Sequence, residues 1–158
     1  GERWSRSEAM NLACDLLWEA FGPPNTAAGP GPEPGLISWV GFYAIAKGHG
    51  EMTLVARRDK PACSPIGLHG ACGRSWSRQV PLVVTDVKSL GSAYIACDPR
   101  DQSEVVIPLF EGGGGCWGVL DADSYDTDAF GEKDVEGMSA LLERLGLTTG
   151  VRPRVESL

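Results

Sequence analysis

Apolar residues near the start of the chain recur at the three- and four-residue spacing of an amphipathic helix. Ser5 and Glu8 stand three residues apart just before this pattern. That is the spacing of a capping box, and it predicts a helix that begins after Ser5. The sequence Gly22-Pro23-Pro24 is typical of a helix end. The apolar face of this expected helix consists of Leu12, Ala13, Leu16, Leu17, Ala20 and Phe21.

A proline- and glycine-rich segment follows, with five prolines and four glycines among the fourteen residues 22–35. It has little apolar surface to bury, so we expect a surface loop inserted between core elements. Beyond it the pattern changes to short β-type runs. Glycine-rich turns at 48–50 and 112–115 join neighbouring runs closely, which favours antiparallel pairing. The expected strands are Leu36–Ala46, Met52–Ala56, Leu82–Val84, Val105–Phe110 and Trp117–Ala122.

The last strong pattern is again helical and is followed by Gly146, a typical helix stop. The order of helix, strands and helix predicts a single α+β domain over residues 1–158. We expect an antiparallel central sheet with the N- and C-terminal helices packed on one face. The apolar stripe of the second helix consists of Val135, Met138, Leu142 and Leu145.

Two connections between the expected strands are long and irregular, residues 57–81 and 85–103. Connections of this length inside a domain are usually lids, binding loops or disordered insertions, and we expect these two to cover a pocket. Three of the five cysteines lie in these loops, which is the first indication of function. Residues 148–158, after the second helix, are expected to form a flexible tail.

Composition and charge narrow the class of protein. The chain has a net charge of -7, which argues against a nucleic-acid binder, because phosphate contacts need clustered Lys and Arg. No apolar run approaches the roughly 18 residues that cross a bilayer, and no signal-peptide pattern opens the chain. We therefore expect no membrane partner and a cytoplasmic protein. The odd number of cysteines argues against a secreted disulfide scaffold and indicates a reducing compartment.

Three carboxylates stand at the ends of two expected core strands. Asp121 and Asp123 are two residues apart in one strand, so their side chains share a face of the sheet, and Glu104 opens another strand. Carboxylates there are costly to desolvate unless they meet a cation or hydrogen-bond donors, or hold a proton. A small ligand with an ammonium group would complement them. The plainer interpretation is that they cap strand ends in water or bind loop amides.

Two aromatic residues in the first expected strand also share a face, because Trp39 and Tyr43 are four residues apart. They are candidates for a pocket wall whose polar tips contact a ligand. Aromatic residues in strands are also ordinary core residues, and the pattern alone leaves both interpretations open.

The cysteines lack the spacing of a zinc site, and no histidine completes one, so we expect no metal. Cys72 lies in Gly70-Ala-Cys-Gly73, where a short helix could begin, and a helix N-terminus would favour its thiolate. Cys97 precedes Asp98, an acid that by itself disfavours a thiolate. Local charges therefore favour Cys72 as the reactive thiol, although spacing alone leaves the roles open. The cysteines that fit small apolar residues are Cys14 and Cys116.

Taken together, these features resemble a known family, the free methionine-(R)-sulfoxide reductases, which are built on a GAF domain. The resemblance runs from about Trp39 to Leu145 and includes the three loop cysteines. Seven motifs stand in the order of the family. They are Trp39–Tyr43, Lys60–Cys63, Gly70–Gly73, Asp86-Val87, Ile95–Asp98, Ser103-Glu104 before an apolar strand, and Gly118–Ser124.

The resemblance implies a GAF-like fold and thiol-dependent reduction of free L-methionine-(R)-S-oxide to methionine. It implies that Cys97 is the nucleophile, Cys63 the resolving thiol and Cys72 a second participating thiol. This assignment reverses the ranking that local charges favour, and we follow the family because a folded pocket can override one sequence neighbour.

The resemblance also implies the residues that would bind substrate. Trp39 and Tyr43 would surround the methyl-sulfoxide end, while Glu104, Asp121 and Asp123 would hold the ammonium group and supply a proton. A desolvated carboxylic acid near the sulfoxide oxygen can stay protonated, so Glu104 or Asp121 is the expected acid.

Further expectations concern turnover. Attack would leave methionine and a cysteine sulfenic acid, which a second thiol converts to an intramolecular disulfide. Thioredoxin, supplied ultimately by NADPH, would reset the enzyme, with no metal or bound organic cofactor. The resemblance also implies a homodimer, the state of many family members. Two alternatives remain: a GAF sensor that binds a small ligand without turnover, and a thiol redox switch without a substrate.

Overall fold

The computed structural model describes residues 4–24, 35–46, 48, 50–93, 97–150 and 153–158. Over these residues the strands form a sheet in the order β3-β2-β1-β6-β5-β4-β7. Consecutive neighbours pair antiparallel, except for the parallel pair of β4 and β7. The α+β class and the antiparallel central sheet are confirmed. The elements are α1 (Arg6–Phe21), β1 (Trp39–Ile45), β2 (Glu51–Arg58), β3 (Ile66–Gly67), α2 (Ala71–Arg78), β4 (Leu82–Val84), a 3-10 segment (Val87–Ala93), β5 (Ser103–Phe110), β6 (Cys116–Ser124), α3 (Glu132–Arg144) and β7 (Glu156–Ser157).

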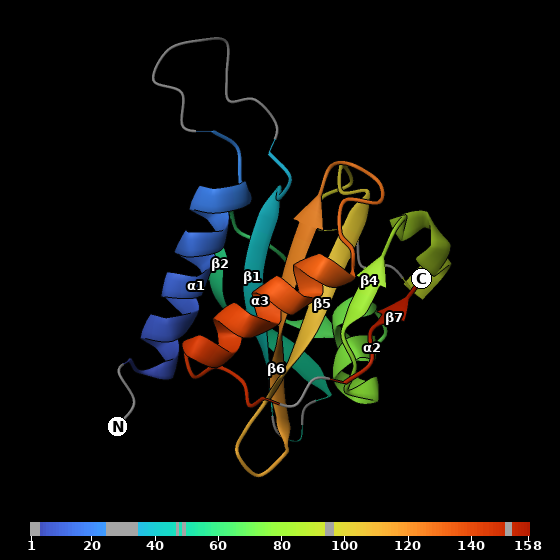
Figure 1. Ribbon diagram of the computed structural model, residues 1–158. Helices are drawn as coiled ribbons and strands as arrows, with labels where there is room; N and C mark the ends of the chain where they lie inside the picture. The colour runs from blue at the N-terminus through green and yellow to red at the C-terminus, as the bar shows by residue number, and fades with distance from the viewer. Residues whose placement is uncertain (1–3, 25–34, 47, 49, 94–96, 151–152) are drawn as a thin grey trace.

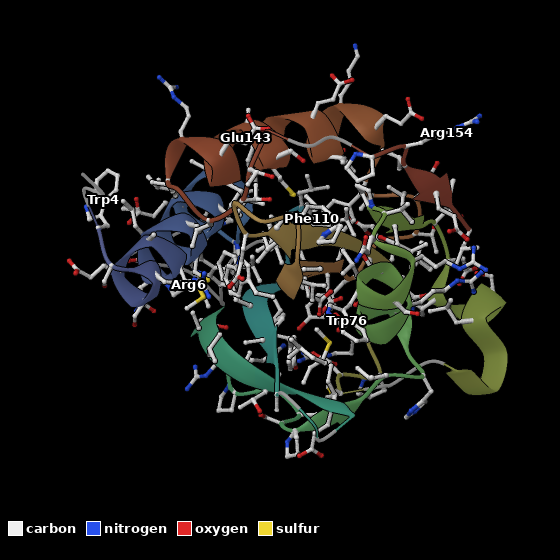
Figure 2. The ribbon with its side chains drawn as sticks, turned by 90° about the horizontal axis from the view of Figure 1, so that it is seen from below. Trp4, Arg6, Trp76, Phe110, Glu143 and Arg154 are labelled. Atoms are coloured by element: carbon white, nitrogen blue, oxygen red, sulfur yellow. A yellow bond between two sulfur atoms is a disulfide. The ribbon has the colours of Figure 1, made fainter. Side chains whose placement is uncertain are left out.

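The two terminal helices, α1 and α3, cover one face of the sheet, as expected (Figure 1). The predicted capping box opens α1: Ser5 Oγ accepts the Glu8 backbone N–H at 3.1 Å, and Glu8 Oε1 accepts the Ser5 N–H at 3.4 Å. Beyond the end of α3, Gly146 adopts φ +73°, a left-handed conformation that favours glycine. Side chains fill the layer between these helices and the sheet (Figure 2). The helix residues buried in this layer are Ala9, Met10, Ala13, Cys14, Leu17, Val135, Met138 and Leu142.

Strand alternation gives the sheet a second buried face, which carries α2 and the pocket described below. In β1, Val40 and Phe42 face the terminal helices, whereas Trp39 and Tyr43 face the other side. Figure 2 shows Trp76 of α2 on this second side, where its indole N–H donates to the Cys116 carbonyl at 3.1 Å. The same period of two continues in β5 and β6, so the fold places Glu104, Asp121 and Asp123 on the α2 side.

The end of the chain differs from the prediction of a flexible tail over 148–158. Glu156–Ser157 forms β7, which pairs with β4, and the Leu158 N–H donates to the Val83 carbonyl at 2.8 Å. Arg78 of α2 also donates to the Glu156 carboxylate at 2.8 and 2.9 Å. The prediction is wrong for these residues because β4 would otherwise leave backbone groups unpaired at the sheet edge. A two-residue strand has no alternation from which it could be recognised.

Other expected elements are only partly described. The Gly112–Gly115 turn is confirmed, since the Glu111 N–H donates to the Gly115 carbonyl at 2.8 Å between β5 and β6. Most of the proline- and glycine-rich segment 22–35 lies outside the described residues, as does part of the turn at 48–50. Within the described ranges no helix is both long and apolar enough to span a membrane.

Candidate active site

Three of the predicted site residues meet in one row across adjacent strands. Trp39 of β1 pairs in register with Asp123 of β6, and Asp123 pairs in turn with Glu104 of β5. In the next row on the same face, Asp121 stands opposite Gly41. Alternation and register together therefore gather the two predicted aspartates, the glutamate and the tryptophan on the α2 side of the sheet.

The aromatic residues of β1 hold a loop over this face. The Trp39 indole N–H donates to the Lys60 carbonyl at 2.9 Å, and the Tyr43 hydroxyl donates to the Cys63 carbonyl at 2.8 Å. A Cβ at Gly41 would lie only 2.7 Å from Trp39 Cζ2, so glycine leaves room for the indole across the strand. Trp39 and Tyr43 thus anchor both ends of the segment 60–63 as well as forming the pocket wall.

Two of the loop cysteines are joined. Cys63 and Cys97 form a disulfide across 34 residues of sequence, with their Cα atoms 5.7 Å apart. Both residues are exposed, so the bond lies at the surface where an external thiol can reach it. Cys14, Cys72 and Cys116 are free. The bond brings together the two loops, 57–81 and 85–103, that were expected to cover a pocket.

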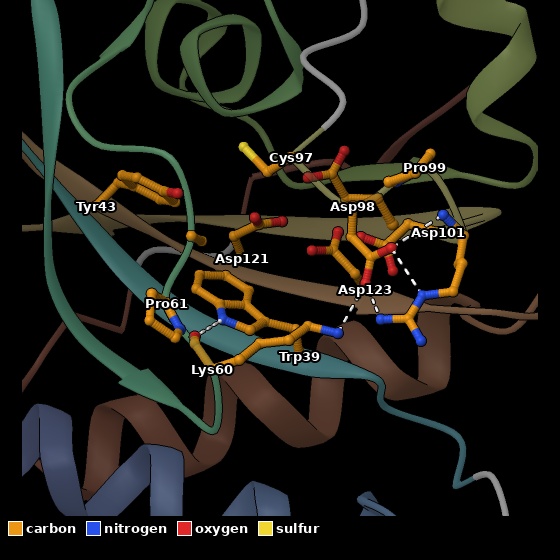
Figure 3. A pocket seen from close by; sticks show the side chains of 13 residues that line it. Trp39, Tyr43, Lys60, Pro61, Cys97, Asp98, Pro99, Asp101, Asp121 and Asp123 are labelled. Carbon is orange, nitrogen blue, oxygen red and sulfur yellow. Dashed lines mark hydrogen bonds and ion pairs between the residues drawn. The ribbon is translucent and has the colours of Figure 1, made fainter.

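A cavity of about 290 Å³ lies between these loops and the sheet (Figure 3). In that view Cys97 and Asp98 come from the loop, while Asp121 and Asp123 rise from β6. Six of the eight residues predicted for the site line the cavity, Cys63 is bonded to one of them, and Cys72 lies against two of them. The lining residues are Trp39, Tyr43, Lys60, Pro61, Ala62, Cys97, Asp98, Pro99, Arg100, Asp101, Glu104, Asp121 and Asp123.

The carboxyl groups on the cavity floor favour their protonated forms. Burial raises the pKa of Asp121 well above its usual value, and the charges of Asp123 and Glu104 raise it further. Burial and the charge of Glu104 act in the same direction on the pKa of Asp123. Burial also raises the pKa of Glu104, against the opposing effect of hydrogen bonds with both aspartates. Asp121 Oδ1 is buried without a hydrogen-bond partner among the described residues, so it is free to receive a donor from a ligand.

Cys72 is a buried thiol, and its surroundings act against the thiolate that local charges led us to expect. The predicted helix does begin there, since α2 starts at Ala71 with Gly70 as its N-cap. Burial nevertheless raises the pKa of Cys72 well above its usual value, and the neighbouring Asp121 and Glu104 raise it further. Desolvation and two carboxyl groups therefore disfavour the Cys72 thiolate, in the direction opposite to the effect expected of the helix N-terminus.

The negative neighbour of Cys97 is balanced by positive charge that sequence reasoning missed. Lys60 Nζ donates to Asp98 Oδ2 at 2.7 Å, and Arg100 Nε and Nη2 each donate to this carboxylate at 3.0 Å. The Tyr125 hydroxyl donates to Asp98 Oδ2 at 3.1 Å. Arg100, followed by Lys60 and Tyr125, holds the pKa of Asp98 well below its usual range despite the opposing effect of burial.

Asp101 is a further buried acid that the sequence did not indicate. Its carboxylate accepts the Ser38 hydroxyl at 3.0 Å, and it lines the cavity. Burial raises the pKa of Asp101 to about 6, partly opposed by that hydrogen bond. Its position could not be predicted from the local sequence, because the fold of a loop places it beside the start of β1.

One group of described residues has the types and proximity of metal ligands. Ligand atoms of Cys72, Glu104 and Asp121 all lie within 4.8 Å of one another. The same buried acids can instead receive the ammonium group of a small ligand, for which the cavity above them has room.

The fold and this pocket together define a GAF domain, whose family profile matches residues 11–148. The chain is 35% identical over 108 residues to GAF domain-containing protein A of Dictyostelium discoideum, covering 68% of this chain and 66% of that protein. It is 34% identical over 135 residues to the free methionine-R-sulfoxide reductase of Saccharomyces cerevisiae, covering 84% and 69%. The chain thus spans about two thirds of the length of these curated relatives.

Comparison with a solved structure leads to the same family. The free methionine-R-sulfoxide reductase of Neisseria meningitidis, crystallised in complex with its substrate, superposes with a TM-score of 0.73 at 31% identity. The aligned region covers 91% of this chain and 80% of that one. The chain belongs to the GAF-domain family of free methionine-R-sulfoxide reductases.

Proposed function

We propose that this protein reduces free L-methionine-(R)-S-oxide to methionine, with Cys97 as the nucleophile and Cys63 as the resolving thiol. The observation that carries the proposal is the Cys63–Cys97 disulfide at the edge of a cavity floored by buried acids. A disulfide in this place is the product that the reaction leaves behind. Family membership supports the same activity, since the yeast and Neisseria relatives bear its name.

The cavity suits a small zwitterion with a polar sulfur group. Asp121, Asp123 and Glu104 would receive the ammonium group, whose positive charge offsets the repulsion that disfavours their ionised forms. Trp39 and Tyr43 would contact the methyl-sulfoxide end, where the aromatic faces bind the methyl group.

The chemical step transfers the sulfoxide oxygen to the enzyme. The Cys97 thiolate attacks the sulfoxide sulfur while a carboxylic acid protonates the oxygen, and we assign that proton to Glu104 or Asp121. Burial raises the pKa of both acids, which is the direction that a proton donor at neutral pH requires. The sulfur–sulfur bond formed by this attack then breaks as the hydroxyl group moves from the substrate sulfur to the Cys97 sulfur. The sulfoxide is thereby reduced by two electrons to methionine, and Cys97 is oxidised to the sulfenic acid that carries the oxygen.

The remaining steps recycle the enzyme. The Cys63 thiol attacks the Cys97 sulfenic sulfur, water leaves, and the disulfide forms. An external dithiol then reduces it, and we propose thioredoxin, with NADPH as the ultimate electron source. The exposure of both cysteines supports reduction from outside. These steps require no metal or bound organic cofactor.

The cellular setting follows from this chemistry. Recycling by a dithiol needs a reducing compartment, so we propose that the protein works in the cytoplasm. The family resemblance extends the proposal to a homodimer, which analytical ultracentrifugation of the reduced protein would test.

The decisive experiment follows both epimers of free methionine sulfoxide with the reduced protein. We expect the R epimer to be consumed with dithiothreitol or with thioredoxin and its reductase, and the S epimer to be spared. Chiral chromatography of the remaining sulfoxide measures both. Binding of the R epimer without consumption would instead indicate a GAF sensor, and neither binding nor consumption would leave a thiol switch.

A Cys63→Ser variant should separate the two thiol roles. Prereduced variant protein should form one equivalent of methionine, because Cys97 is intact, and then stop with thioredoxin as reductant, because no disulfide can form. Methionine release and trapping of the sulfenic acid by dimedone measure this. Cys116 is a free thiol outside the cavity lining, and a Cys116→Ser variant should recycle normally. Continued turnover of Cys63→Ser with thioredoxin would contradict the assignment.

A further inference from the structure

A second link runs beside the disulfide. Lys60 Nζ donates to Asp98 Oδ2 at 2.7 Å and to the Tyr125 hydroxyl at 2.6 Å, and that hydroxyl contacts the same Asp98 oxygen at 3.1 Å. The three side chains close a triangle of hydrogen bonds, which we call the loop clamp. The Asp98 side chain is only 13% exposed, whereas that of Lys60 is 35% exposed.

The loop clamp joins the same two segments as the disulfide. Lys60 stands three residues before Cys63, and Asp98 directly follows Cys97. Each segment also has its own attachment to the sheet: the Trp39 indole N–H donates to the Lys60 carbonyl, and the Gln102 N–H donates to the Ser124 carbonyl at 2.8 Å. The Lys60–Asp98 ion pair therefore spans the gap between the loops.

We propose that Lys60, Asp98 and Tyr125 are positioning residues that hold the two cysteine segments together when the disulfide is reduced. The proposal rests on the proposed function for its purpose, because resolution needs Cys63 close to the newly formed Cys97 sulfenic acid. The charges that make the clamp, an ammonium group and a carboxylate, do not change when the thiols are oxidised or reduced, so the clamp is available in both states.

By holding the two segments together, the loop clamp gives the Cys63 thiol a high effective concentration at Cys97. The Cys97 sulfenic acid and the Cys63 thiol condense to the disulfide with loss of water, and this needs the two Cα atoms near their present 5.7 Å separation. A loop that samples open positions lowers the effective concentration in proportion to the time spent open. A partly buried carboxylate with three side-chain donors is a stronger tie than an exposed ion pair.

Arg100 offers a matched comparison. It also binds the Asp98 carboxylate, at 3.0 Å, but it lies in the same loop as Asp98, and its side chain is 66% exposed. Removing Arg100 takes away one positive charge near Cys97 without cutting the link between the loops. Removing Lys60 takes away the same charge and cuts that link.

The test is the redox potential of the Cys63–Cys97 pair, measured by equilibrating wild type, Lys60→Met, Lys60→Arg, Tyr125→Phe and Arg100→Met in glutathione buffers. The disulfide exchanges with two glutathione thiols to give the dithiol and oxidised glutathione. We expect Lys60→Met to lower the effective thiol concentration about tenfold, which is a shift of about 30 mV toward a more oxidising potential. Tyr125→Phe should shift the potential in the same direction by less, and Lys60→Arg should restore most of the wild-type value.

The comparison with Arg100→Met decides between a tether and a charge effect. We expect that variant to stay within about twofold of the wild-type effective concentration. An unchanged potential in both Lys60→Met and Tyr125→Phe would overturn the loop clamp, and so would an equal shift in Lys60→Met and Arg100→Met. No methionine sulfoxide is present in this measurement. A failure of the proposed enzyme activity would therefore show separately, as absence of turnover in wild type.

Discussion

Prereduced Cys97→Ser protein should form no methionine from methionine-(R)-S-oxide, not even a single equivalent. The block is chemical, because a serine hydroxyl is not ionised at neutral pH and its oxygen cannot take up the sulfoxide oxygen as a sulfenic acid. The loss should be at least about 10³-fold, as for other enzymes deprived of their nucleophile. A single-turnover assay without external reductant, with methionine quantified by mass spectrometry, measures the result.

Two cysteine variants complete this experiment. Cys116 is a partly buried thiol at the start of β6 that lies outside the cavity lining, so Cys116→Ser should still give one equivalent. Cys72→Ser tests the competing nucleophile. If this variant forms no methionine while Cys97→Ser forms one equivalent, attack belongs to Cys72 and the roles assigned above are reversed.

The strand pattern predicted only part of the arrangement of the site residues on the sheet. Alternation with period two places Asp121 and Asp123 on one face of their strand, and Trp39 and Tyr43 on one face of theirs, from the sequence alone. Their convergence with Glu104 depends on the strand order β1-β6-β5, which follows from short antiparallel connections only for β5 and β6. The β1–β6 pair joins strands about eighty residues apart, and here the family resemblance supplied what local pattern could not.

Cys72 shows why local electrostatics can mislead. The helix start was predicted correctly at Gly70–Ala71, and a helix N-terminus does favour a thiolate. In the folded chain the same thiol lies against Glu104 and Asp121, which come from strands more than thirty residues away. Burial and those acids act in the opposite direction, so the sign of the effect at Cys72 is set by tertiary neighbours.

The side chains that offset the negative charge of Asp98 also could not be predicted from the local sequence pattern. Asp98 looks like an unfavourable neighbour of Cys97 in the sequence, yet Lys60, Arg100 and Tyr125 bind its carboxylate in the structure. Arg100 lies two residues after Asp98, but Lys60 and Tyr125 come from segments that are distant from it in the sequence. Loop residues are placed by the contacts that the whole fold makes, and a periodicity argument has no access to them.

The buried acids of the site should lower the free energy of unfolding of the protein. We expect Asp121→Asn to raise the free energy of unfolding at pH 8 by about 1 to 3 kcal/mol while it lowers kcat/KM by about 10² to 10⁴-fold. The pKa of Asp121 is raised in the folded protein, so folding takes up a proton at a pH between the unfolded value near 4 and the higher folded value. The amide needs no proton, but it can neither donate one to the sulfoxide oxygen nor carry a charge for the ammonium group.

The pH dependence identifies the cause. In wild type the stability associated with Asp121 is fully present below the unfolded pKa and is lost as the pH rises toward the higher folded pKa. The difference in Tm between variant and wild type should therefore be largest near pH 8 and should shrink toward zero as the pH falls to about 4. Asp126, an exposed aspartate just after β6, is the control, and Asp126→Asn should leave Tm and kcat/KM close to wild type. A Tm of Asp121→Asn at or below that of wild type at pH 8 would refute the stability cost. It would mean that the charged Asp121 carboxylate is stabilised by a partner in the folded wild-type protein.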